Sequence, residues 1–175
     1  MTVTDDDKRF ACTLIDGARM YAAAADAVND KLPNSLHVLS HLLGMSAELA
    51  LKAYLKNNAG STSELRKLGH DLGDLYEKAQ EFGLAYTGSR NFRLRVLGAN
   101  YQERLFAYPE KGRLNVINPS SLREITHDLI VDIFAQIQGE AVLHELSGQP
   151  GLMIQSEYPQ EVDASAWAAS VARME

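Results

Sequence analysis

Apolar residues recur every three or four positions along most of this chain, and that period is typical of amphipathic helices. It predicts helices over residues 7–29, 35–58, 62–68, 71–82, 91–105 and 119–146. Pro33, Gly60, Gly69 and Gly83 lie between them, where residues that end a helix are expected. Because long helices joined by short connections pack as antiparallel neighbours, we expect an all-α, up-and-down bundle of four to five helices.

Side chains at the helical spacing should face the core of this bundle. The expected inward positions are Phe10, Leu14, Ala18, Tyr21, Ala25 and Val28, then Leu39, Leu42, Leu43, Ser46, Leu49, Ala50 and Ala53, then Leu72, Leu75, Tyr76 and Ala79, then Phe92, Val96, Leu97, Tyr101 and Leu105, and finally Leu122, Ile125, Leu129, Ile133, Ile137 and Ala141. The segments 61–64 and 121–124 have the spacing of a capping box and predict where two helices begin. Asp71 is expected to cap the helix that follows it.

Residues 106–118 interrupt the helical pattern. Pro109 and Gly112 prevent a helix from continuing there, so the segment is expected to form an irregular or hairpin-like insertion. The predicted bundle covers residues 1–148. The sequence of 149–175 is a polar tail rich in turn residues, with a short helix expected over 163–173.

The helix over 35–58 carries polar groups in largely apolar surroundings. Opposite its main apolar stripe lies a narrow sector that holds His37, His41, Glu48 and Lys52. Leu51 and Leu55 lie on or beside the same sector. A helix that is apolar on two sides is usually buried twice, which predicts a second packing surface against another element or another subunit. Glu48 and Lys52 either line a polar site at that surface or form a buried ion pair that fixes the packing register.

The composition narrows the class of protein. With 17 Lys+Arg against 23 Asp+Glu, the net charge is -6, which argues against a surface built for DNA. Residues 90–113 differ, because they hold six basic and two acidic residues, and this is the footprint of an anionic ligand or of a solvated face. Cys12 has no cysteine to pair with, and neither a leader-like start nor a membrane-length apolar run is present. We therefore expect a cytoplasmic protein without a membrane partner.

Two pairs of arginine and histidine are candidate catalytic groups. Arg66 with His70 and Arg123 with His127 each have three residues between them, and on a continuous helix Arg123 and His127 would share one face. A histidine can transfer protons near neutral pH while an arginine stabilises charge on a phosphate, and attack by a 2′-hydroxyl on the adjacent phosphate needs no metal. The alternative for His70 is a packing role beside the capping residue Asp71.

Ligand binding is the second chemistry that the sequence suggests, with the ion pair described above as one candidate. Arg104 and Tyr108 flank the insertion, and a cation beside an aromatic ring suits phosphate pairing and base stacking. His37 and His41, one turn apart, have the spacing of metal ligands. Two histidines without a strong third ligand are more often incidental, so we expect neither a metal nor another cofactor.

Several short motifs, taken in order, resemble the HEPN superfamily (higher eukaryotes and prokaryotes nucleotide-binding domain). They are the stretch from Ser46 to Leu55, Gly69-His70-Asp71-Leu72 with Leu75, Tyr101, and Tyr108-Pro109 with Gly112. The resemblance covers residues 35–140 and implies a helical bundle, frequently a homodimer, found in bacterial defence and toxin–antitoxin modules. It also implies a nucleotidyltransferase or antitoxin as partner, and in many members a metal-independent ribonuclease. This chain lacks the wider Arg–His spacing on a late helix that the nuclease members have.

Three hypotheses follow for the function. The first is a HEPN-like helical protein of the bacterial defence or toxin–antitoxin type that binds RNA, a nucleotide or a protein partner as a dimer. The second is a metal-independent endoribonuclease that uses one of the two Arg–His pairs. The third is a non-catalytic dimerisation or adaptor bundle, in which Glu48 and Lys52 only set the pairing of the helices.

Overall fold

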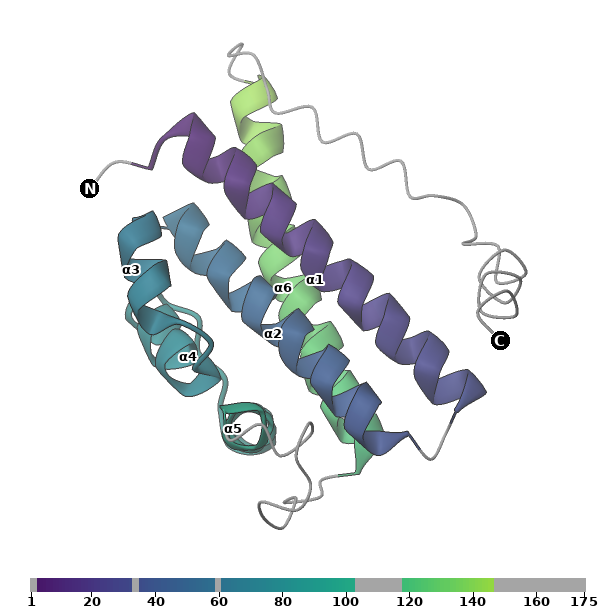
Figure 1. Ribbon diagram of the computed structural model, residues 1–175. Helices are drawn as coiled ribbons and strands as arrows, with labels where there is room; N and C mark the ends of the chain where they lie inside the picture. The colour runs from purple at the N-terminus through teal and green to yellow at the C-terminus, as the bar shows by residue number, and fades with distance from the viewer. Residues whose placement is uncertain (1–2, 33–34, 59–60, 103–117, 147–175) are drawn as a thin grey trace.

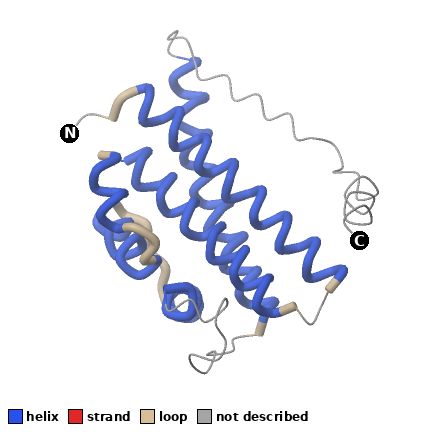
Figure 2. The backbone as a smooth tube through the Cα atoms, viewed as in Figure 1, coloured by secondary structure: helices blue, strands red, loops and turns tan. Residues whose placement is uncertain are grey.

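The computed structural model describes residues 3–32, 35–58, 61–102 and 118–146. This part of the chain is all-helical, as predicted, with six helices and no strand (Figures 1 and 2). The helices are α1 (Asp5–Lys31), α2 (Leu36–Asn58), α3 (Thr62–Leu68), α4 (Leu72–Glu81), α5 (Gly88–Gln102) and α6 (Pro119–Leu146). The predicted insertion, except for Asn118, and the predicted tail helix lie outside the described residues. None of the helices in the described part is long and apolar enough to cross a bilayer.

The long helix α2 lies at the centre of the bundle. It packs against α1 and α6 on one side and against α3, α4 and α5 on the other (Figure 1). Leu51 and Leu55, on the second side, are almost fully buried. The predicted second packing surface is therefore present, and the chain's own helices α3 to α5 cover it.

The contact between α1 and α2 is built from small side chains. The inward face of α1 consists of Ala11, Cys12, Ile15, Ala18, Ala22 and Ala25. The prediction that Phe10 faces the core is wrong, because its side chain points outward and is 43% exposed. Small residues let two helix backbones approach closely, which rotates the bulkier residues away from the interface. The hydroxyl of Ser46 takes part in this contact by donating to the carbonyl of Ala18 at 2.7 Å.

A buried lysine joins three helices near the start of α1. Lys56 of α2 forms an ion pair with Asp7 of α1 and donates to the Thr62 hydroxyl of α3 at 3.0 Å. Asp7 also completes the capping box with Thr4 at the start of α1. The hydrogen bond from Lys56, supported by those from Thr4, holds the pKa of Asp7 well below its usual range. This contact fixes the N-terminal turn of α1 to the C-terminal end of α2.

The residues that cap α3 and α4 are the ones that the sequence predicted. The Ser61 hydroxyl accepts from the backbone of Glu64 and caps α3, which ends at Gly69, where φ is +60°. The Asp71 carboxylate accepts from the backbone N–H groups of Gly73 and Asp74 and caps α4. The predicted inward residues of α4 are all buried: Leu72, Leu75, Tyr76 and Ala79. These caps fix the turn between α3 and α4, which holds His70.

Among the described residues, the predicted inward face of α5 is wrong at Phe92, and the predicted inward residue Leu105 lies outside them. Phe92 is 62% exposed, whereas Leu94, Leu97 and Tyr101 are buried. At 100° per residue, Leu94, Leu97 and Tyr101 share one face and Phe92 lies opposite. This face packs on α2, α4 and α6.

The start of α6 also differs from the prediction. Asn118, directly before Pro119, accepts from the backbone of Ser120 through its side chain at 3.0 Å, so it occupies the capping position expected for Ser121. The carboxylate of Glu124 instead pairs with Arg93 of α5 at 2.6 Å. The predicted inward residues Leu122, Ile125, Leu129, Ile133 and Ile137 are buried, and the side chain of Ala141 lies outside the described part.

Candidate functional site

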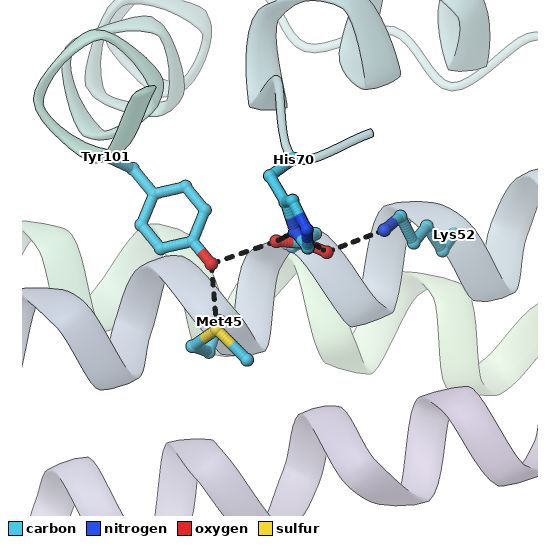
Figure 3. A network of polar contacts seen from close by, with 5 residues as sticks. Met45, Lys52, His70 and Tyr101 are labelled. Atoms are coloured by element: carbon cyan, nitrogen blue, oxygen red, sulfur yellow. Dashed lines mark hydrogen bonds and ion pairs between the residues drawn. The ribbon is translucent and has the colours of Figure 1, made fainter. Parts of the chain in front are cut away.

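The carboxylate of Glu48 is the centre of a polar network inside the bundle (Figure 3). The residue is only 3% exposed, yet three side chains donate to it. Lys52 Nζ lies 2.6 Å from Oε1, and Tyr101 OH lies 2.9 Å from Oε2. His70 Nδ1 lies 2.9 Å from Oε1 and 3.1 Å from Oε2. We call Glu48, Lys52, His70 and Tyr101 the Glu48 cluster.

Three separate features of the chain bring this cluster together. Lys52 follows Glu48 by one turn of α2, as the sequence predicted. The turn between Gly69 and the capping residue Asp71 places His70 over α2. Tyr101 reaches the carboxylate from the last turn of α5 (Figure 3). The cluster therefore lies where α2, α5 and the α3–α4 turn meet.

The electrostatics of the cluster keep Glu48 ionised at neutral pH. Burial by itself raises the pKa of a carboxyl group, but the hydrogen bonds from Lys52, His70 and Tyr101 outweigh it and hold the pKa of Glu48 below its usual range. An ionised carboxylate only accepts hydrogen bonds, so His70 carries its proton on Nδ1 when it is neutral. Nε2, the other ring nitrogen, then has a free lone pair.

His70 is the accessible member of the cluster. Its side chain is 77% exposed, whereas that of Glu48 is 4% exposed and that of Lys52 16%. The imidazole therefore contacts the buried Glu48 carboxylate on one side and is open to solvent on the other. A histidine in this arrangement can accept or donate a proton at Nε2.

Two cationic residues precede His70 closely in the sequence. Arg66 and Lys67 occupy the last turn of α3, directly before the turn that holds His70, and both are exposed. Within the described residues, no hydrogen bond joins Arg66 to His70. The side chain that orients His70 is therefore Glu48, and the predicted pairing of Arg66 with His70 stays a prediction.

The second predicted pair lies on the interface of α1 and α6. Asp26 of α1 accepts from Arg123 Nε at 2.8 Å and from Nη2 at 2.7 Å. His127 Nε2 lies 3.0 Å from the other oxygen of the same carboxylate. Arg123 and His127 do share a helix face, as predicted, but Asp26 engages both of them. No sequence pattern pointed to Asp26, because it lies far from both residues along the chain.

Of the residues that the sequence suggested for metal binding or base contact, the structure describes His37 and His41. His41 lies beside the ring of Tyr101, with centroids 6.0 Å apart, and does not join Glu48. Nδ1 of His37 is buried and has no hydrogen-bond partner among the described residues. Among the described residues, no three side chains of the His, Cys, Asp or Glu type gather in a metal-binding group. Arg104 and Tyr108 lie outside the described residues.

Sequence reasoning named His70 and Tyr101 but did not link either of them to Glu48. The helical period assigns Tyr101 only to the core, and the spacing of charged residues links His70 to Arg66 instead of Glu48. One signal was available, since Glu48 needs more than one donor to be buried as an anion. Comparison with models of protein families, with curated proteins and with solved structures finds no match to this chain.

Proposed function

We propose that this chain is a HEPN-like helical protein that binds RNA or a nucleotide through the exposed edge of the Glu48 cluster. The observation that carries the proposal is the exposed imidazole of His70 held on a buried carboxylate. The exposed cations Arg66 and Lys67, in the last turn of α3 directly before the turn that holds His70, add positive charge to the segment. These groups suit a phosphate, because charge-assisted hydrogen bonds to phosphate oxygens are among the strongest that side chains make.

The charge of the cluster is compatible with an anionic ligand. Glu48 and Lys52 neutralise each other at 2.6 Å. The buried carboxylate therefore does not repel a phosphate that approaches the exposed imidazole of His70.

A second candidate is a metal-independent endoribonuclease, and the outward direction of Nε2 favours it. In this mechanism, His70 takes the proton from a 2′-hydroxyl, whose oxygen then attacks the adjacent phosphorus. The 5′-oxygen of the next nucleotide leaves and receives a proton. Arg66 or Lys67 stabilises the charge that develops on the phosphate oxygens. Arg123 and His127 are weaker candidates for this chemistry, because Asp26 engages both of them.

The third candidate is a non-catalytic adaptor, and the completeness of the cluster favours it. All three donors to Glu48 come from the same chain and tie α2 to α5 and to the α3–α4 turn. The second face of α2 needs no second subunit to cover it. Homodimer formation is therefore a separate proposal that rests on the HEPN resemblance, as are a defence or toxin–antitoxin setting and a nucleotidyltransferase or antitoxin partner.

Binding of a labelled single-stranded RNA, followed by fluorescence anisotropy in EDTA, tests the proposal. His70→Gln should weaken binding by roughly tenfold, which corresponds to the loss of one hydrogen bond to a charged group. His127→Gln is the matched control, because His127 is also a partly exposed histidine bound to a carboxylate. Equal affinities of wild type and His70→Gln would contradict the proposal.

The same samples separate the three candidates. Shortened RNA on a gel, absent with His70→Gln, would support the endoribonuclease. Binding without cleavage would support the first proposal. No binding of RNA or nucleotide, together with an unchanged melting temperature in their presence, would favour the adaptor. Sedimentation at micromolar concentration tests the homodimer, and a monomer at all concentrations would contradict it.

A further inference from the structure

The ring of Tyr101 lies along one face of α2. His41, Gly44, Met45 and Glu48 follow one another on this face at spacings of three or four residues. A Cβ atom added to Gly44 would come within 2.8 Å of Cε2 and 2.9 Å of Cγ of the Tyr101 ring. Real Cβ atoms essentially never approach other atoms this closely. Glycine at position 44 is therefore what allows the ring to lie directly on α2.

This close approach delivers the Tyr101 hydroxyl to the Glu48 carboxylate. The hydroxyl oxygen lies 2.9 Å from Glu48 Oε2 and 2.8 Å from Met45 Sδ. A hydroxyl has one proton to donate, and an ionised carboxylate is a far stronger acceptor than a thioether. Tyr101 therefore donates to Glu48, and Met45 provides a packing contact.

The two oxygens of the carboxylate are then held from opposite ends. Lys52 binds Oε1, Tyr101 binds Oε2, and His70 Nδ1 lies within 3.1 Å of both. A carboxylate bound at both ends cannot rotate freely about its terminal bond. The direction in which it presents its lone pairs to His70 is therefore set partly by Tyr101.

We propose that Tyr101 is a positioning residue for His70, which acts through Glu48 and depends on the absence of a side chain at Gly44. The role assigned to His70 as the ligand-contacting group rests on the proposed function. The orientation of His70 itself does not, because it can be measured without any ligand. Since Tyr101 lies in the last turn of α5, the inference makes the end of that helix part of the site.

Nuclear magnetic resonance of ¹⁵N-histidine-labelled protein tests the orientation directly. The ring ¹⁵N shifts of neutral His70 report which nitrogen holds the proton, and wild type should show the Nδ1–H form. Tyr101→Phe keeps the ring and removes the hydroxyl, so the carboxylate can turn away from the imidazole and His70 should lose part of its Nδ1–H population. Met45→Leu is the matched control, since it alters the other contact of the hydroxyl and should leave His70 unchanged. An unaltered His70 spectrum in folded Tyr101→Phe would overturn the inference.

The role of Gly44 is tested with a double-mutant cycle. Gly44→Ala should disturb His70 as Tyr101→Phe does, because the added methyl group displaces the ring. In a Tyr101→Ala background there is no ring to displace, so Gly44→Ala should have no further effect on the His70 spectrum. Circular dichroism verifies that each variant keeps its helices. Equal effects of Gly44→Ala in both backgrounds would contradict the role given to Gly44.

The affinity for RNA connects the positioning to the proposed function. Tyr101→Phe should weaken binding by about 3- to 10-fold, because the lost hydrogen bond acts on the partner of the contacting group rather than on the ligand. If wild type binds no RNA but its His70 spectrum still responds to Tyr101→Phe, the proposed function fails and the positioning stands. If RNA binds and both the spectrum and the affinity ignore Tyr101→Phe, the positioning fails and the proposed function stands.

Discussion

Replacement of Glu48 by glutamine removes the negative charge of the cluster and changes little else. The glutamine side chain has nearly the same shape and keeps one acceptor oxygen. That oxygen can satisfy only part of the three donors that the carboxylate serves. The Lys52 ammonium, which lies mostly inside the protein, also loses its counter-charge. We therefore expect Glu48→Gln to fold and to be less stable than wild type.

The expected loss of stability depends on how deeply each hydrogen-bond partner of Glu48 is buried. A hydrogen bond to a charged group contributes about 1.5–3 kcal/mol. The contribution of His70 is discounted, because its side chain is 77% exposed and water replaces the lost contact. Tyr101 and Lys52 are the buried partners, and the substituted glutamine satisfies one of them in part. The expected loss is about 2–3 kcal/mol, which lowers the melting temperature by roughly 4–12 °C for a chain of this length.

The loss should also depend on pH, with a sign fixed by the pKa of Glu48. Because that pKa is held below its usual range, the carboxylate stabilises the fold above its unfolded pKa of about 4.3. This contribution disappears as the pH falls through the lower folded pKa. The difference in unfolding free energy between wild type and Glu48→Gln should therefore be full at pH 7 and should narrow below about pH 4.

Urea unfolding at several pH values measures both effects. The matched control is Glu77→Gln on α4, whose carboxylate is largely exposed and makes only a 3.6 Å ion pair with Arg95. The control should change stability by less than about 0.5 kcal/mol. A loss of that small size for Glu48→Gln at pH 7, or a difference that stays constant into acid, would refute the account of the cluster.

Three further predictions test the fold. Phe92→Ser should change the unfolding free energy by less than about 0.5 kcal/mol, whereas Leu97→Ala should cost about 2–5 kcal/mol, and equal losses in urea unfolding would contradict the described face of α5. Burial raises the pKa of the Cys12 thiol, so it should react with a disulfide reagent slowly in the native state and rapidly in urea, and fast native reaction would be inconsistent with the α1 interface. Asp7→Asn should lower the melting temperature at pH 7 and lower it less in acid. Because the pKa of Asp7 is low, its contribution to stability disappears only when acid protonates the carboxylate, and a pH-independent loss would argue against its pairing with Lys56.

Short-range chemistry made most of the fold predictable. The caps Ser61 and Asp71 and the helix-ending Gly69 act through groups a few residues away, so the sequence places them well. The inward face of α4 follows from a strong helical period. The errors have two causes. Close packing of small residues, a tertiary effect, excludes Phe10 from the core, whereas Asn118 takes the cap expected for Ser121 through a local competition.

The candidate site was predictable only in part, for a related reason. Glu48 and Lys52 are neighbours on one helix, so a helical wheel pairs them. His70 and Tyr101 join them across 22 and 53 residues of chain, and such contacts depend on how the helices pack. The buried carboxylate indicated that more donors were needed but not where they came from. Asp26 illustrates the same limit at the α1–α6 interface.

Titration of the ¹⁵N-histidine-labelled protein with a short single-stranded RNA tests the central claim most directly, namely that ligand contact occurs at the imidazole held by Glu48. The account predicts that the ring signals of His70 move with saturation, while those of His127, which is similarly bound to a carboxylate, stay in place. A spectrum in which His127 moves and His70 does not would contradict it, as would a complex that leaves both unchanged.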